Sequence, residues 1–132
     1  MKSALLPLAI LVFAAATPAL AHHSFAATYD EQQTVTIEGN ITAFLYRNPH
    51  SFVEMETTDD RGVTTKWAAE WFSSGRLSRV GVTADTFKPG DHVILTGAPG
   101  RIASEHRLHL KTITRPSDGL KLDRMAARQR GR

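Results

Sequence analysis

Residues 34–47 read TVTIEGNITAFLYR, and polar and apolar side chains alternate along most of this segment. Such alternation is typical of a β-strand with one buried face. Gly39 lies inside the strand and has no side chain to pack, which predicts a bulge or a sharp bend there. A bend of this kind lets one long strand curl around a small barrel. Asn48-Pro49 is expected to end the strand.

The same alternation predicts two further strands, at residues 52–57 and 63–70. An apolar strand is expected at 92–97 after a Pro-Gly turn, and a last strand is expected at 106–114. The sequence between the second and third strands is Asp59-Asp60-Arg61-Gly62, whose composition favours a hairpin turn. Ser73 can cap a short helix that ends near Gly81. The expected order is therefore a three-strand meander, one helix and two more strands.

This order predicts an all-β fold with one short helix. It is the connectivity of the OB-fold, a five-stranded Greek-key barrel that closes its own edges. An open sandwich of five or six strands is the alternative. The OB-like barrel is favoured because the first strand is long and contains a glycine, and because the helix falls between the third and fourth strands.

The amino terminus has the features of a cleavable secretory signal peptide. Lys2 supplies a positive charge, residues 5–16 form an apolar run too short to span a bilayer, and small Ala19 and Ala21 precede the expected cleavage site. A membrane anchor is the alternative interpretation. We expect a signal peptide at 1–21, an amino-terminal extension at 22–33, the barrel domain at 34–120 and a basic flexible tail at 121–132. The mature chain is then periplasmic or secreted, with no transmembrane anchor after cleavage.

The composition excludes several chemistries. The chain contains no cysteine, which excludes disulfides, thiolate metal sites and cysteine nucleophiles. The formal net charge is +3. Lys2 lies in the expected signal peptide, and most of the remaining excess of basic side chains lies in 121–132, so residues 22–120 carry a small net negative charge. A nucleic-acid partner is therefore not expected, because the barrel is not a basic body that binds phosphates.

Two histidines directly follow the expected cleavage site. Cleavage after Ala21 leaves His22 with a free α-amine beside its imidazole, and these two nitrogens form a chelate without any folding. His23 and His50 add nitrogen donors, and a nitrogen-rich site favours Cu(II), with Ni(II) and Zn(II) behind it. The arrangement resembles the histidine brace of exported copper proteins, for which only His22 has a direct counterpart here. The alternative is that His22 and His23 are mobile polar residues and that His50 caps a turn.

A ligand face is expected where the loop between strands one and two and the loop between strands four and five flank the barrel. The candidate ligand-face residues are Phe52, Glu54, Trp67, Glu70 and His106. Trp67 is equally well explained as a core residue, and the glutamates as surface carboxylates on strands. His109 alternates with leucines and shares its strand face with Arg107 and Lys111, so it is interpreted as solvent-facing.

A set of motifs runs through the chain: the His-His-Ser-Phe-Ala start at 22–26 and Asn48-Pro49-His50, together with Tyr29-Asp30, Trp67, Glu70, Lys88-Pro89-Gly90-Asp91 and Asp118-Gly119. These motifs resemble those of a family of small exported Gram-negative bacterial proteins of unknown function, DUF6152. The resemblance covers nearly all of the mature chain. The chain departs from the pattern at residues 45–47, where such proteins often carry a tryptophan. The resemblance implies an exported domain and no particular reaction.

Two function classes remain open. The first is a periplasmic binding module that holds a transition metal, with copper as the preferred ion, through the processed amino terminus and the Asn-Pro-His loop. The second is a metal-free interaction domain that recognises another envelope protein, a small molecule or a saccharide. An enzyme ranks third, because the sequence contains no catalytic triad, phosphate loop or open zinc motif.

Overall fold

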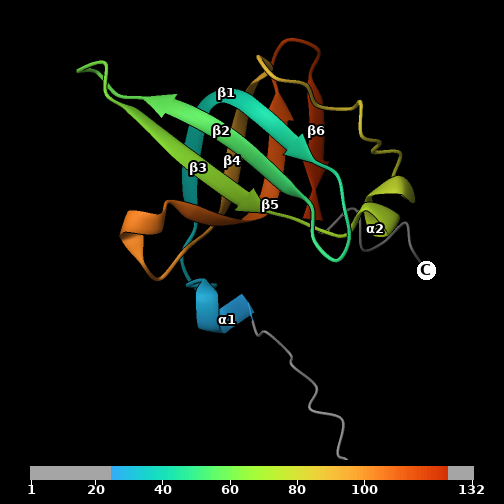
Figure 1. Ribbon diagram of the computed structural model, residues 1–132, viewed down its shortest axis with the longest axis horizontal. Helices are drawn as coiled ribbons and strands as arrows, with labels where there is room; N and C mark the ends of the chain where they lie inside the picture. The colour runs from blue at the N-terminus through green and yellow to red at the C-terminus, as the bar shows by residue number, and fades with distance from the viewer. Residues whose placement is uncertain (1–24, 125–132) are drawn as a thin grey trace, which may run out of the picture.

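The computed structural model of the chain describes residues 25–124, in which a strongly curved sheet is flanked by two short helices (Figure 1). The strands are β1 Val35–Leu45, β2 Phe52–Thr58, β3 Thr64–Glu70, β4 His92–Pro99, β5 Arg107–Arg115 and β6 Leu120–Asp123. The helices are α1 Phe25–Thr28, α2 Ser74–Ser78 and the 3-10 turn η1 Ala103–Glu105.

The strands form a closed barrel. Their order in the sheet is β3-β2-β1-β4-β5-β6, and a parallel pairing of Ala68–Glu70 in β3 with Arg107–His109 in β5 closes the first five strands on themselves. The predicted five-stranded barrel, with a short helix between its third and fourth strands, is confirmed. Its connectivity is compatible with an OB-fold, and the pairing of β3 with β5 excludes the open sandwich.

Strand β1 pairs with two different strands along its length. Its first half pairs with β4 and its second half with β2, and the register against β2 shifts between Ile41 and Ala43. The bulge therefore lies just after Gly39, the position predicted from the sequence. Gly39 has a different role: a Cβ there would lie 2.0 Å from the carbonyl oxygen of Glu56, so the missing side chain lets two backbones approach closely.

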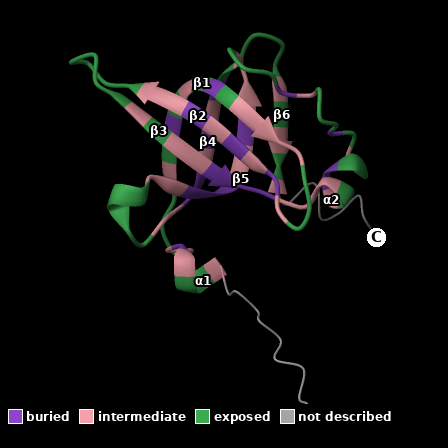
Figure 2. Cartoon of the chain, in the orientation of Figure 1, coloured by how far each residue is buried: buried purple, intermediate pink, exposed green. Residues whose placement is uncertain are grey.

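The core fills the inside of the barrel, and buried residues alternate with partly exposed ones along most of β2 and β4 (Figure 2). Its fully buried members include Val53, Met55, Leu95, Leu108 and Ile113. Leu77 of α2 is also fully buried in this cluster, and the side chain of Ser73 accepts a hydrogen bond from the Arg76 N–H at the start of the helix. The predicted N-cap and the predicted apolar side chain of the helix are thus both present.

The elements that were not predicted from the sequence include α1 and β6. Helix α1 lies in the segment assigned to the amino-terminal extension, and the strand bridge between Tyr29 and Gly100 attaches its end to the barrel. Strand β6 pairs with β5 and includes Asp123, so it overlaps the segment assigned to the tail. The expected signal peptide, His22, His23 and residues 125–132 lie outside the described residues. None of the helices within 25–124 has the length and apolar character needed to cross a membrane.

Candidate functional site

A buried carboxylate lies at the carboxyl end of β3. Glu70 follows Ala69, whose side chain belongs to the core, so alternation places the carboxylate on the outer side of the barrel. Glu70 is nevertheless only 8% exposed. The segment after α1, which carries Tyr29, and the β1–β2 loop, which carries His50, both contact it.

Three donors from three separate segments converge on Glu70. The hydroxyl of Tyr29 donates to Oε2 at 2.5 Å, and Nδ1 of His50 lies 2.6 Å from Oε1. Nη2 of Arg107, the first residue of β5, lies 3.4 Å from Oε2. Burial, followed by the hydrogen bond to Glu70, raises the pKa of Tyr29 above its ordinary value. The phenol therefore stays protonated and acts as a hydrogen-bond donor to the Glu70 side chain.

The loop that carries His50 is held at both ends. Ser51 is fully buried, its N–H donates to the carbonyl of Phe72, and its carbonyl accepts from the N–H of Trp71. The side-chain oxygen of Asn48 accepts a hydrogen bond from the Ser74 hydroxyl at 3.0 Å, which ties the loop to α2. The Asn-Pro-His sequence therefore folds into a fixed loop that presents one imidazole to Glu70.

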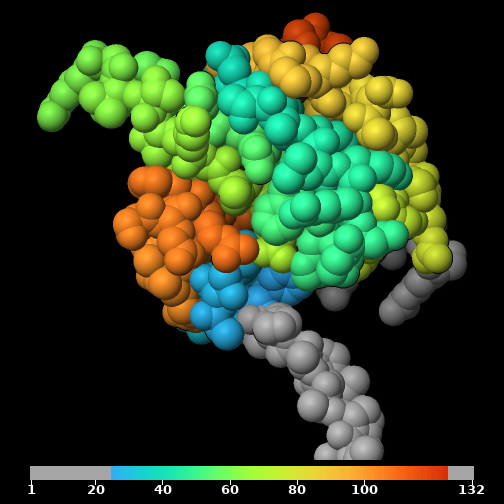
Figure 3. All heavy atoms as spheres, in the orientation of Figure 1, coloured from blue at the N-terminus to red at the C-terminus, as the bar shows by residue number. Residues whose placement is uncertain are grey.

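A pocket of about 320 Å³ opens beside this carboxylate. It is lined by Phe25, Thr28, Tyr29, Pro49, His50, Glu70 and Arg107. The ring of Phe25 lies 5.3 Å from the ring of His50, centroid to centroid, so α1 packs directly on the Asn-Pro-His loop. Figure 3 shows α1 (blue) lodged between the connection from β4 to β5 (orange) and the region of the β1–β2 loop (green-blue).

His109 is buried, which corrects the interpretation that it faces solvent. It is 3% exposed, because the ring of Phe25 stacks on it at 3.9 Å and Arg124, which follows β6, reaches it from the other end of the chain. Glu31 accepts a hydrogen bond from its Nδ1. Burial lowers the pKa of His109 below its ordinary value, the hydrogen bond to Glu31 raises it, and the charge of Arg124 lowers it further. The alternating pattern could not reveal this cover, because both covering segments are remote in sequence.

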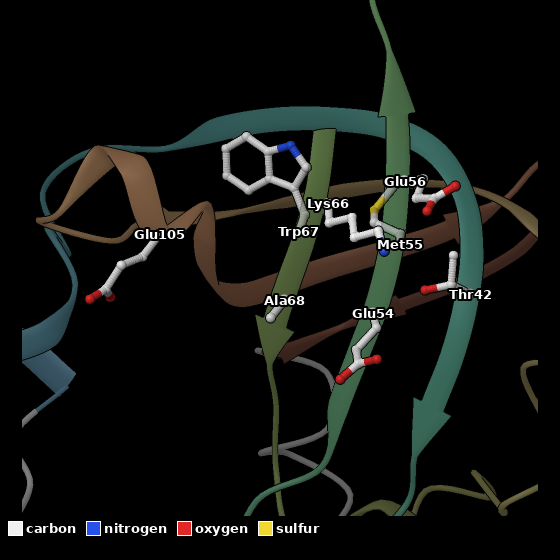
Figure 4. Close-up of a pocket in the computed structure, with 8 residues that line it drawn as sticks. All are labelled: Thr42, Glu54, Met55, Glu56, Lys66, Trp67, Ala68 and Glu105. Atoms are coloured by element: carbon white, nitrogen blue, oxygen red, sulfur yellow. The ribbon is translucent and has the colours of Figure 1, made fainter. Parts of the chain in front are cut away.

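The predicted ligand-face residues do not form one site. Glu70 and His50 meet in the pocket beside α1, whereas Glu54 and Trp67 line a separate open pocket of about 520 Å³ between β2, β3 and η1. The ring of His106 lies 5.2 Å from that of Trp67, and Phe52 instead lies under the guanidinium of Arg47. Figure 4 shows the carboxylates of the open pocket spread along its rim rather than pointing at one another.

The described part of the predicted metal site consists of His50 alone. Its partners His22 and His23 lie outside the described residues. Within 25–124, no three histidine, aspartate or glutamate side chains are grouped so that they could hold a metal ion.

Sequence reasoning missed three participants in the site: Tyr29, Arg107 and Glu31. Tyr29 lies 41 residues from Glu70 in sequence, and Arg107 lies 37 residues away, so no local period links them. The only sequence signal for Tyr29 was its place in the family motif with Asp30.

The fold and site define a small closed β-barrel protein with a covered pocket built around one buried carboxylate. Residues 9–109 match the model of DUF6152, a family of unknown function, and the chain belongs to this family. No curated protein matches the sequence.

Proposed function

We propose that the chain is exported and that, once residues 1–21 are removed, it is a periplasmic or secreted module that binds Cu(II). The metal ligands are the α-amine and imidazole of His22, the imidazole of His23 and that of His50. Export is supported by the short apolar run and the small residues that precede His22. One observation carries the metal proposal: the contact between His50 and the buried Glu70.

This contact prepares His50 to bind a metal. A carboxyl oxygen that lies 2.6 Å from Nδ1 as an acceptor favours the tautomer with its proton on that nitrogen, so the lone pair is on Nε2. A carboxylate behind a histidine is the usual partner of a metal-binding imidazole, because it fixes the ring and raises its basicity. The His50 side chain is 38% exposed, so an ion can approach it.

The position of Phe25 in α1 supports the proposed combination of ligands. Phe25 contacts the His50 ring, and His22 is only three residues earlier in the sequence. Three extended residues span at most about 11 Å. This short sequence distance between His22 and Phe25 supports a shared site for His22 and His50. Nitrogen donors of this kind favour Cu(II) over the other divalent first-row metals.

Copper titration of the processed protein tests the proposal. Mass spectrometry of the exported protein first checks that it begins at His22. Cu(II) affinity is then measured by competition with a chelator, with electron paramagnetic resonance reporting the ligand nitrogens. A form with one alanine added before His22, and the His50→Gln variant, are each expected to bind at least about tenfold more weakly.

The control variant is His92→Gln. His92 is a half-exposed histidine that contacts Glu38 and Asn40 on the surface of β1 and β4, away from the pocket. Its replacement is expected to leave Cu(II) affinity unchanged. Equal affinities for the processed protein, the extended form and His50→Gln would contradict the proposal, as would an exported species that begins elsewhere.

The open pocket favours a second function, recognition of an envelope protein, a small molecule or a saccharide without a metal. Trp67 lines this pocket, and an indole offers a flat apolar surface on which a sugar ring can stack. Binding that persists in EDTA and is lost in Trp67→Ala supports this function. Binding that requires added copper and survives the substitution opposes it.

A further inference from the structure

Arg107 brings a positively charged group into the pocket beside α1. Its side chain is 34% exposed, and Glu70 is its ion-pair partner among residues 25–124, through one nitrogen at 3.4 Å. Its Cζ lies 5.6 Å from the centre of the Tyr29 ring, which orients the guanidinium. A guanidinium carries five N–H donors in a planar fork, so its contacts with Glu70 and with the Tyr29 hydroxyl leave other donors available.

The carboxylate of Glu70 does not prevent an anion from binding in the pocket. Both of its oxygens accept from donors, Oε1 from His50 and Oε2 from Tyr29 and Arg107. Among the residues that the structure describes, it is the only acidic one that lines this pocket. Since its charge is opposed by Arg107 and by two hydrogen bonds, a second carboxylate can approach the outer edge of the guanidinium.

The rest of the pocket is largely apolar. Phe25 and Pro49 form part of its wall, with the ring of Tyr29 beside them and the hydroxyl-bearing Thr28 at the edge. A volume of about 320 Å³ is at the lower end of the range for small-molecule sites. An apolar cavity with one cationic fork selects for a molecule with a small apolar body and one anionic group.

We infer that this pocket binds a small organic carboxylate, whose carboxylate pairs with Arg107 and whose apolar body packs against Phe25 and Pro49. The site goes beyond the proposed copper function and does not depend on it. It uses Arg107, which is not among the proposed metal ligands, and it is complete within the described residues.

Binding of benzoate and butyrate to metal-free protein tests the inference. The protein carries the extra alanine before His22 and is kept in EDTA, so the outcome is independent of copper. Titration calorimetry and shifts in the amide NMR spectrum report the binding. Benzoate or butyrate is expected to bind saturably and to shift the amide resonances of residues 25–29 and of His50. Benzamide, a neutral molecule of the same shape as benzoate, is expected to bind at least about tenfold more weakly.

Variants distinguish the contribution of the Arg107 guanidinium to binding from that of the protein's overall charge. Arg107→Gln is expected to weaken carboxylate binding at least about tenfold. Arg107→Lys keeps the positive charge but loses the planar fork of donors, so its affinity is expected to lie between those of the parent protein and Arg107→Gln. The matched control is Arg61→Gln, an exposed arginine in the β2–β3 turn, which is expected to bind as the parent does. Each variant's amide spectrum checks that the barrel is folded.

Three results would overturn the inference. They are no saturable binding of either carboxylate, equal binding of benzamide and benzoate, and unchanged binding by a folded Arg107→Gln protein. The benzamide comparison uses the unaltered pocket, so it is decisive even where a variant fails to fold.

Discussion

Glu70 shows how the environment of a single side chain can differ from its sequence pattern. Glu54 and Glu70 both alternate with core residues on neighbouring strands and belong to the outer side of the sheet. Glu54 remains partly exposed, whereas Glu70 is buried beneath Tyr29 and His50. A buried carboxylate is tolerated only when donors compensate it, and here each oxygen has at least one.

Replacement of Tyr29 by phenylalanine tests how strongly that compensation stabilises the fold. Tyr29→Phe removes a buried hydrogen bond to a charged group and is expected to lower the free energy of unfolding by about 1.5–3 kcal/mol. Tyr46→Phe is the matched control, because its hydroxyl contacts only the neutral carbonyls of Ser74 and Val82. It is expected to cost about 0.5–1.5 kcal/mol. Urea unfolding of both variants measures the difference, and a larger loss in Tyr46→Phe would contradict this account.

Among the elements, β1 and β4 depend on glycine for close backbone contact. A Cβ at Gly39 would lie 2.0 Å from the Glu56 carbonyl oxygen, and one at Gly97 would lie 2.2 Å from the His109 carbonyl oxygen. The register between β4 and β5 shifts next to Gly97. Both glycines therefore lie near irregular points where strands curl into the barrel, as expected for glycine inside a strand.

Alanine substitutions test these contacts. Gly39→Ala and Gly97→Ala force a methyl group against backbone that cannot give way, and each is expected to destabilise the protein by about 1–3 kcal/mol. Gly75→Ala is the control. Gly75 lies in α2 with nothing within 4 Å of its Cβ position, so alanine is expected to be neutral or to stabilise by up to about 1 kcal/mol. Thermal and urea unfolding give the comparison, and equal effects at all three positions would refute the steric explanation.

At the scale of the whole molecule, the two ends of the described chain meet over β5. Phe25 of α1 stacks on His109, and the guanidinium of Arg124, after β6, lies 5.9 Å from the Phe25 ring. Glu31 contacts the same imidazole. His109 is therefore buried only when both terminal segments pack on this face of the barrel. Its protonation is thus coupled to folding of the complete domain.

Stability is accordingly expected to depend on pH through His109. The folded protein lowers the pKa of this group, so between that value and the ordinary value near 6.5 the unfolded chain binds more protons than the folded one. The stabilisation is complete above about pH 6.5 and is lost as the pH falls below it. Glu31, Glu70 and Arg124 are the charged groups that act on the ring.

Urea unfolding at several values between about pH 7.5 and pH 5 measures this dependence. His109→Gln is expected to flatten the fall in unfolding free energy at acid pH. His92→Gln, at an exposed position, is expected to retain it. A slope that is unchanged in His109→Gln would mean that other groups carry the acid sensitivity.

Local sequence patterns were sufficient to predict the barrel, because alternation, turn composition and helix capping depend on residues that are close in sequence. They yielded the long bent β1, the β2–β3 hairpin, the helix after β3 and the candidate histidine at position 50. They also placed Glu70 on the correct strand and the correct side of it. They could not assign a common pocket to His50 and Glu70, nor could they separate these residues from Trp67.

The arrangement of the site arises only when the barrel closes and the terminal segments pack on it. Glu70 accepts a hydrogen bond from Tyr29, which lies 41 residues away in sequence, and His109 is hydrogen-bonded to Glu31, which lies 78 residues away. Burial of a polar side chain depends on what covers it, and here the covering segments α1 and the residues after β6 have no periodic signal of their own. The sequence therefore specifies which groups are present, whereas the packing of distant segments creates the pocket in which they meet.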